Sequence, residues 1–159
     1  TGMEHIIESL LFLAKPQDGI LQQVPIQLSR STEEILEKYE EAPIEYHKPK
    51  KEISSTIDYE LYKRMLTNLI ENAIKYKSAG KINISLTKES LEISNSVEKN
   101  ISPEELNRFT ERFYQRDTSR NTEGYGLGLA LVAKIVGIFG WTLTFECKEN
   151  IFTVKIGIK

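Results

Sequence analysis

The sequence is poor in cysteine, in long apolar runs and in net charge. Its single cysteine, Cys147, excludes an internal disulfide and is typical of a reducing compartment. The longest apolar run, residues 10–14, is far shorter than the roughly 20 residues that a membrane-crossing helix needs. Basic residues number 21 and acidic residues 23, and the two signs are interleaved along the chain. We therefore expect a globular protein with no nucleic acid as partner.

What is present predicts one domain with a short flanking element. Apolar spacing indicates helices over residues 3–15, 29–41, 58–76, 103–106 and 128–139, and strands over 23–28, 44–47, 81–86, 91–94, 141–147 and 151–157. Helices that alternate with strand pairs and a final hairpin predict an α+β fold, built as a two-layer sandwich. The hairpins argue against an all-parallel sheet.

The helix expected over residues 58–76 carries a polar stripe. At 100° per residue, Asn68, Asn72 and Lys75 fall within about 60° of one another. An apolar arc covers the rest of the helix: Met65, Leu66, Leu69, Ile70, Ala73 and Ile74. A solvated stripe would more often carry Glu, Lys or Gln, because an asparagine inside a helix costs up to ~0.7 kcal/mol relative to alanine. Amide oxygens suit a hard cation such as Mg²⁺, and the lysine suits a phosphate.

A second candidate element is the glycine-spaced segment of residues 124–129. It reads Gly124, Tyr125, Gly126, Leu127, Gly128 and Leu129, and a strongly helical stretch follows it directly. Such spacing alone is also compatible with a flexible hinge. Alternating glycines let a backbone approach a ligand closely, and a helix N-terminus favours anions. The segment lacks the Gly-Lys-Ser/Thr of a P-loop and follows a polar loop rather than a strand, so it differs from both common nucleotide motifs.

Between these two elements lies a polar loop that carries arginines. Arg112, Arg116 and Arg120 recur at intervals of four residues. They form either a solvated, ion-paired surface or, beside a triphosphate, ligands of its γ-phosphate. Phe113 and Tyr114 could anchor the loop to the body of the domain. Residues 110–124 are the stretch that we expect to be most mobile.

Taken together, these segments resemble the catalytic ATP-binding domain of bacterial two-component sensor histidine kinases, a branch of the GHKL superfamily. Residues 68–76 match the N box of that family, residues 109–117 the F box and residues 124–129 the second glycine box. The resemblance runs from about residue 20 to the C-terminus. It implies a Bergerat-type ATP-binding fold, in which about three helices cover a mixed, mostly antiparallel sheet.

The resemblance also implies roles for individual residues. Asn72 would be the chief Mg²⁺ ligand with Asn68 beside it, and Lys75 would touch phosphate. Tyr76 would pack on the purine of ATP. The turn of residues 124–129 would wrap the triphosphate, with Arg112 and Arg116 nearby. ATP and Mg²⁺ are thus the expected cofactors, and the expected reaction is transfer of the γ-phosphate to a histidine.

The same resemblance predicts the domain organisation and the partners. Residues 1–19 would be the tail of a dimerisation helix and a linker, with residues 1–2 a cloning remnant, and residues 20–159 the ATP-binding catalytic domain. The phosphoacceptor histidine would lie on a preceding helix, since His5 and His47 sit in no acceptor motif. We expect the chain alone to be monomeric and unable to autophosphorylate. The parent would be a homodimeric membrane sensor with this domain in the cytoplasm and a response regulator as partner.

The sequence departs from the family pattern at the first glycine box. An Asp-x-Gly-x-Gly motif should follow the strand that ends near Ser94, but residues 95–100 contain neither aspartate nor glycine. In the family, the aspartate of this motif accepts the adenine amino proton. The resemblance implies that Asn95 takes its place and accepts that proton through a neutral amide oxygen. Binding should then weaken by about 1 kcal/mol, roughly fivefold. The departure keeps open a degenerate pseudokinase or nucleotide-sensing module.

Two other family members are poorer alternatives. A gyrase-type ATPase has a glutamate as hydrolytic base four residues before the metal-binding asparagine, and here that position is Asn68. An anti-sigma-factor kinase is also possible, but the helix expected over residues 3–15 favours a sensor kinase. The sensor kinase therefore remains the preferred interpretation.

Overall fold

The computed structural model describes residues 2–14, 22–111, 114 and 128–159 of the chain. Its helices are α1 (Gly2–Ala14), α2 (Leu28–Leu36), α3 (Tyr59–Tyr76), α4 (Pro103–Leu106) and α5 (Gly128–Phe139), with a 3-10 turn η1 (Glu37–Tyr39). Its strands are β1 (Gln23–Gln27), β2 (Ile44–His47), β3 (Ser54–Asp58), β4 (Ile82–Leu86), β5 (Ser90–Ser96), β6 (Thr142–Lys148) and β7 (Ile151–Gly157). Among these helices none is long and apolar enough to cross a membrane.

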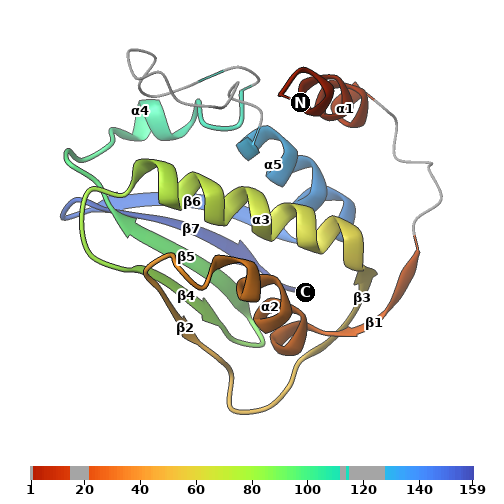
Figure 1. Ribbon diagram of the computed structural model, residues 1–159. Coiled ribbons are helices and arrows are strands. Elements are labelled where there is room, and N and C mark those ends of the chain that lie inside the picture. Colours follow the sequence, from red (N-terminus) through yellow and green to blue (C-terminus); the bar gives the residue numbers. More distant parts are fainter. Residues whose placement is uncertain (1, 15–21, 112–113, 115–127) are drawn as a thin grey trace.

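The main sheet is mixed and mostly antiparallel, as predicted. Its strand order is β2-β4-β5-β7-β6; only the β2–β4 pair is parallel, and the other three pairs are antiparallel. Helices α2, α3 and α5 lie over one face of this sheet (Figure 1). The two-layer α+β sandwich is thereby confirmed. A second, two-stranded sheet of β1 and β3 was not predicted, because β3 (SSTID) is mostly polar.

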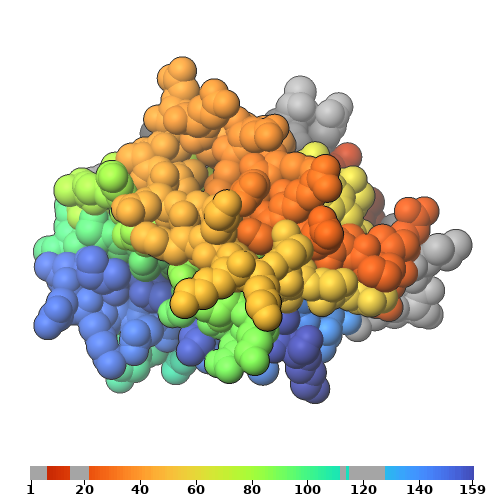
Figure 2. All heavy atoms as spheres, turned by 90° about the horizontal axis from the view of Figure 1, so that it is seen from below, coloured from red at the N-terminus to blue at the C-terminus, as the bar shows by residue number. Residues whose placement is uncertain are grey.

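The hydrophobic core fills the space between the sheet and the helices. Alternation along β4 buries Ile82, Ile84 and Leu86, and register pairs Ile84 with Ile93 of the antiparallel β5. Strand alternation sends every second side chain to the same face, so the polar residues between them face away from the helices. From below, the segment from β1 to β3 occupies the centre of the surface (Figure 2, orange to yellow).

Helix α3 crosses the sheet, and the sequence fixes where it starts. Asp58 is its N-cap, with a side chain that accepts a hydrogen bond from the backbone N–H of Leu61 at 3.1 Å. Its inner face is fully buried by six residues: Tyr62, Met65, Leu66, Leu69, Ile70 and Ala73. Ile74, which we expected in the apolar arc, is instead 38% exposed. The polar stripe is therefore flanked by an accessible isoleucine rather than by core.

Helix α2 starts one residue earlier, and ends earlier, than the predicted span of residues 29–41. The helix begins at Leu28, its N-cap Gln27 makes no side-chain hydrogen bond, and Ser29 lies inside the helix. The free N–H groups of Ser29 and Arg30 donate instead to the two carboxylate oxygens of Glu52, at 2.7 and 3.1 Å. A residue more than twenty positions away thus caps this helix, which local sequence patterns could not indicate.

Candidate functional site

The predicted polar stripe lies on one side of α3. Asn68, Asn72, Lys75 and Tyr76 are all partly exposed, in contrast to the buried inner face of the same helix. The Lys75 ammonium lies 5.0 Å from the centre of the Tyr76 ring. The stripe therefore gathers two amides, a cation and an aromatic ring on one partly exposed side of α3.

Glu71, next to Asn72 in the sequence, faces elsewhere. Burial raises the pKa of Tyr39 in η1, and the negative charge of Glu71 raises it further. Glu71 is thus close enough to Tyr39 to be felt electrostatically. Glu71 therefore lies towards η1 rather than along the polar stripe.

The first residue of α5 meets the stripe at Asn68. A Cβ atom placed on Gly128 would lie 3.3 Å from the Asn68 amide oxygen, tighter than an ordinary van der Waals contact. The Asn68 Nδ2 group donates to the Arg64 carbonyl oxygen at 2.8 Å, and this bond leaves Oδ1 directed at α5. Two motifs sixty residues apart in the sequence therefore converge, and glycine at position 128 permits the close approach.

Helix α5 brings a positive N-terminal end to this meeting point. It runs for 12 residues from Gly128 and has no acidic residue in its first turn. The N–H groups of a helix N-terminus and the helix dipole favour an anion there. Leu129 follows in the first turn and is partly buried. The other predicted members of the turn and the loop lie outside the described residues: Gly124, Tyr125, Gly126, Leu127, Arg112 and Arg116.

Asn95 lies on the helix-facing side of β5. Strand β5 continues to Ser96 rather than ending near Ser94, so Asn95 is inside the strand and only 3% exposed. Its Nδ2 group donates to the Ser96 carbonyl oxygen at 3.0 Å. With the N–H side of the amide engaged, the side chain presents its oxygen as the acceptor.

Hydrogen bonds tie the end of α3 to the same end of β5. The backbone N–H of Ser78 donates to the Ser96 carbonyl oxygen at 3.0 Å, and the N–H of Ala79 donates to Ser96 Oγ at 3.0 Å. The Ser78 and Ser96 hydroxyls are bonded to each other as well. Because Ser96 is adjacent to Asn95, these bonds hold the last turn of α3 beside the strand segment that carries the predicted base-binding residue.

The segment that replaces the first glycine box keeps an ordinary backbone. Among the described residues, the non-glycine positions with positive φ are Glu149 and Asn150, in the β6–β7 turn. Residues 97–100 therefore need no glycine in the conformation observed. The N–H of Asn150 donates to Asn100 Oδ1 at 2.7 Å, and the N–H of Val97 donates to the Asn150 carbonyl oxygen at 2.8 Å. These two hydrogen bonds connect the β6–β7 turn to residues 97–100.

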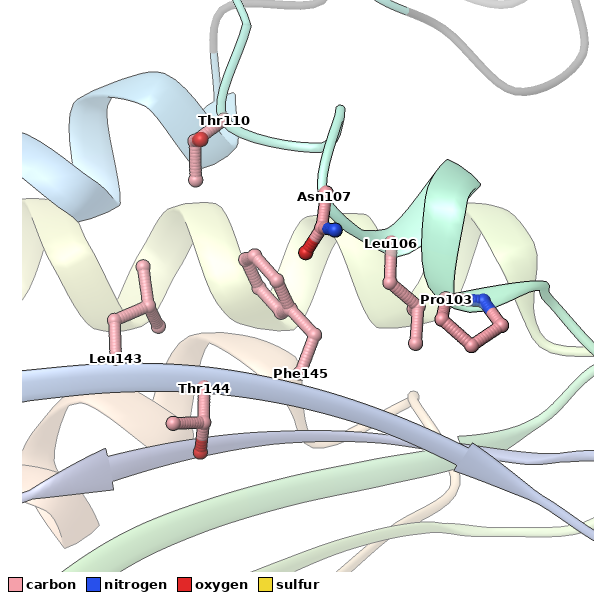
Figure 3. Close-up of a pocket in the computed structure, with 7 residues that line it drawn as sticks. All are labelled: Pro103, Leu106, Asn107, Thr110, Leu143, Thr144 and Phe145. Carbon is pink, nitrogen blue, oxygen red and sulfur yellow. The ribbon is translucent and has the colours of Figure 1, made fainter.

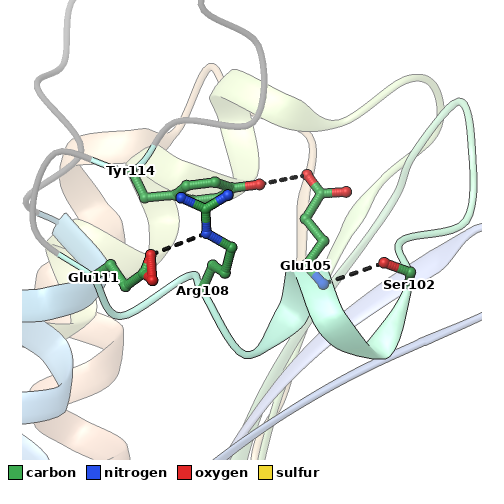
Figure 4. Close-up of polar contacts among 5 residues, drawn as sticks. All are labelled: Ser102, Glu105, Arg108, Glu111 and Tyr114. Carbon is green, nitrogen blue, oxygen red and sulfur yellow. Dashed lines mark hydrogen bonds and ion pairs between the residues drawn. The ribbon is translucent and has the colours of Figure 1, made fainter.

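An aromatic cluster anchors the start of the loop. Phe109, almost fully buried, packs edge-on against Phe152 with ring centres 5.5 Å apart, and Tyr114 lies against Phe109 at 5.8 Å. The Tyr114 hydroxyl donates to Glu105 at 2.9 Å, while the Arg108 guanidinium covers the Tyr114 ring at 4.6 Å (Figure 4). The anchoring role predicted for Tyr114 agrees with these contacts. Phe109, which was not predicted as an anchor, lies at the centre of these ring contacts. Phe113, the other predicted anchor, lies outside the described residues.

A hollow between α4 and β6 lies apart from the predicted site residues. It measures about 410 Å³ and is lined by Pro103, Leu106, Asn107, Thr110, Leu143, Thr144 and Phe145. Leu143 and Phe145 rise from β6 towards α4, and Thr144 points to the opposite side of the strand (Figure 3). None of the predicted site residues that the structure describes lines it.

The described residues offer no conventional metal cluster. No group of three or more His, Cys, Asp or Glu side chains in the described ranges is placed to hold a metal ion. His47 is an exposed residue of β2 whose Nε2 lies 3.4 Å from Asn83 Oδ1. The side chain of His5 lies outside the described part of the chain.

Comparison with known proteins finds relatives along almost the whole chain. The family model described as "Histidine kinase-, DNA gyrase B-, and HSP90-like ATPase" matches residues 57–158, which include α3, β5 and α5. The chain is 31% identical over 174 residues to the sensor histidine kinase HprS of Escherichia coli and 32% identical over 172 residues to the sensor protein CiaH of Streptococcus pneumoniae.

These two alignments cover 98% and 99% of this chain but 36% and 39% of the relatives. The chain thus spans little more than a third of the length of the curated relatives it matches. Among solved structures, histidine kinase AdeS of Acinetobacter baumannii superposes with a TM-score of 0.77 at 23% identity, covering 98% of this chain and 77% of that one. At that identity the likeness concerns the fold.

Proposed function

Because the chain belongs to the histidine kinase-, DNA gyrase B- and HSP90-like ATPase family, as the ATP-binding domain of a sensor histidine kinase, we propose that it binds Mg·ATP for phosphoryl transfer. The acceptor would be a histidine on a dimerisation domain of the same homodimeric kinase, which passes the phosphoryl group to a response regulator. In the parent protein this domain would lie on the cytoplasmic side of a membrane sensor.

The meeting of Asn68 and Gly128 carries the proposal. It places an amide oxygen of α3 against the N-terminus of α5, so a cation ligand and an anion-binding helix end share one position. Asn72 lies one turn further along α3 and adds a second amide oxygen. Two neutral oxygens fit Mg²⁺ that is completed by phosphate oxygens and water. When bound, Mg²⁺ neutralises charge that develops on the phosphates.

The remaining residues of the site would position the nucleotide. Lys75 supplies a positive charge for phosphate oxygens, and Tyr76 supplies an aromatic face for the purine. The N–H groups at the start of α5 receive further phosphate oxygens. The nucleophile would come from the dimerisation domain, so this chain contributes orientation and charge neutralisation rather than a base.

Asn95 would recognise the base through a fixed acceptor. Its Nδ2 group is held by the Ser96 carbonyl oxygen, so turning the amide over would bring two oxygens together. The amide therefore offers an acceptor to the 6-amino group of adenine, as the family's aspartate does, but without a negative charge. This orientation favours retained selectivity for adenine together with weaker binding.

A pair of glycine substitutions in α5 tests whether the close approach of Gly128 to Asn68 matters for nucleotide binding. In Gly128→Ala the new methyl group presses on Asn68 Oδ1, and we expect Mg·ATP affinity to fall about tenfold. Gly137→Ala is the matched control, because a Cβ there meets nothing within 4 Å. It should leave affinity unchanged and stabilise the helix by up to about 1 kcal/mol. Equal affinity in the two variants would remove the contact of residue 128 with Asn68 from the nucleotide site.

Asn95→Asp tests the base-recognition role. Restoring a charged acceptor should tighten ATP about fivefold and leave a purine nucleotide without the 6-amino group unaffected. Calorimetric titration with both nucleotides measures the difference. An unchanged ATP affinity would mean that the base is recognised elsewhere.

The absence of the first glycine box favours a second candidate, a nucleotide-sensing module without phosphoryl transfer. The two candidates are separated by supplying a dimerisation domain of the parent kinase in trans with γ-labelled ATP. Label on its histidine supports the kinase. Nucleotide binding without any labelling would support the sensing module instead.

A further inference from the structure

The C-terminal end of α1 is held by a lysine of α5. The Lys134 ammonium donates to the carbonyl oxygens of Phe12 and Leu13, the latter at 3.2 Å. Helix α1 carries no basic residue in its own last turn. A cation there interacts favourably with the helix dipole and with carbonyls that have no partner within the helix. Lys134 therefore places a positive charge from α5 at the C-terminal end of α1.

Two cations lie close to the ring of Phe12. The Arg64 guanidinium of α3 is 5.2 Å from the ring centre, and the Lys134 ammonium is 5.1 Å from it. Both distances are within the range of cation–π attraction. On the same helix Ile7 and Leu11 are more than half exposed, whereas Phe12 is packed against the core. Phe12 is thus the side chain through which the end of α1 is gripped.

This grip adjoins the proposed nucleotide site. Arg64 and Asn68 lie one turn apart on α3, and the Arg64 carbonyl oxygen accepts the hydrogen bond that orients the Asn68 amide. Helix α5 contributes Lys134 to the grip and Gly128 to the nucleotide site. The same two helices therefore hold α1 and, by the proposed function, the triphosphate.

We propose that α1 is a strap that a bound nucleoside triphosphate releases. The inference rests on the proposed function, since it needs a triphosphate beside Asn68. An arginine within reach of phosphate forms charge-assisted hydrogen bonds, which are stronger than an exposed cation–π contact. Arg64 is therefore drawn from Phe12 to the phosphates when the site fills, and the end of α1 loses one side of its grip.

Thermodynamic linkage gives the strap a second consequence. If nucleotide binding loosens α1, then loosening α1 must strengthen nucleotide binding by the same factor. Removing the Phe12 ring should therefore raise affinity for a non-hydrolysable ATP analogue about fivefold, the size expected for an exposed cation–π contact.

Hydrogen exchange and titration of the 159-residue chain test the strap. In Phe12→Ala, amides at the end of α1 should exchange about fivefold faster than in the unmodified chain without nucleotide. Leu11→Ala is the matched control, because its side chain is 56% exposed, and it should change neither exchange nor affinity. Adding the ATP analogue to the unmodified chain should accelerate exchange at the same amides.

The possible outcomes separate the strap from the proposed function. Faster exchange in Phe12→Ala together with tighter analogue binding establishes the strap and its coupling. Equal exchange in Phe12→Ala and Leu11→Ala would overturn the grip, whatever the nucleotide does. Faster exchange with unchanged affinity would overturn the coupling. Failure of the unmodified chain to bind the analogue would overturn the proposed function and with it the release by triphosphate, while exchange without nucleotide would still report on the grip.

Discussion

The two sides of α3 differ in what their residues contact. The inner side packs six residues into the core at 2% exposure or less, whereas Asn68, Asn72, Lys75 and Tyr76 remain partly open on the other. Residues on opposite sides of this one helix therefore have different surroundings, the core on one side and partial exposure on the other. Substitutions on the inner side should change stability, and substitutions on the polar side should change nucleotide affinity.

The largest effect should come from the inner side. Leu69 is 1% exposed, and Leu69→Ala should lower the free energy of unfolding by about 2–5 kcal/mol, because it leaves a cavity. Ile74→Ala is the control within the same helix. At 38% exposure it should cost less than about 1 kcal/mol. Urea denaturation of both variants measures the contrast, and similar losses would place Ile74 in the core after all.

On the polar side, Asn72→Ala should act in the opposite way. Loss of the amide oxygen should weaken Mg·ATP binding about tenfold or more. Stability should stay the same or rise by up to about 0.7 kcal/mol, since alanine is the better helix former. Glu71→Ala, at the exposed neighbouring position, should leave affinity unchanged. Calorimetric titration decides, and equal affinity for Asn72→Ala and the unmodified chain would exclude Asn72 from the site.

The N-cap of α3, Asp58, lies at the start of the helix and so affects the residues of both sides. Asp58→Ala should lower the free energy of unfolding by about 1 kcal/mol, because the Leu61 N–H loses its acceptor. Asp58→Ser keeps a cap and should retain most of that stability. If thermal unfolding finds the two variants equal, the capping bond contributes nothing measurable.

The smallest effect concerns pH and the inner side. Burial raises the pKa of Tyr62, whose hydroxyl is bonded to Thr32 Oγ1 at 2.7 Å. The folded state therefore keeps this phenol neutral, while the unfolded chain ionises it near pH 10. The contribution of this neutral phenol to the free energy of unfolding is present below pH 10. It is lost as the pH rises from there towards the raised pKa of Tyr62 in the folded state. One such tyrosine removes about 0.8 kcal/mol between pH 9 and 10.5.

Tyr62→Phe isolates that contribution. The variant loses its hydrogen bond to Thr32 at every pH, but its stability should fall less steeply above pH 9 than that of the unmodified chain. Denaturant titrations at pH 8, 9 and 10.5 provide the slope. Parallel curves for the two proteins would show that the phenol ionises equally in both states.

Regular periodicity and local caps explain what the sequence could predict. The apolar stripe of α3, its cap Asp58 and the alternation of β4 depend on neighbours in the chain, and all three are present in the structure. Gly140, the residue that follows α5, has a positive φ of 71°. Local features of this kind leave a direct mark on residue order.

Long-range partners explain what the sequence could not predict. The cap of α2 comes from Glu52, the pairing of β3 with β1 involves a mostly polar strand, and the exposure of Ile74 depends on which helices lie beside α3. The polar stripe of α3 was predicted, but the contact of Asn68 with Gly128 depends on how α3 and α5 pack. Such contacts are set by tertiary packing.

Calorimetric titration of the unmodified chain tests the central claim most directly. The ligands are Mg·ADP and a non-hydrolysable ATP analogue, with GTP as the control. The account predicts binding of the adenine nucleotides in the micromolar to submillimolar range, with GTP markedly weaker. No detectable adenine nucleotide binding would contradict it, and the polar side of α3 would then be a family scaffold without its ligand.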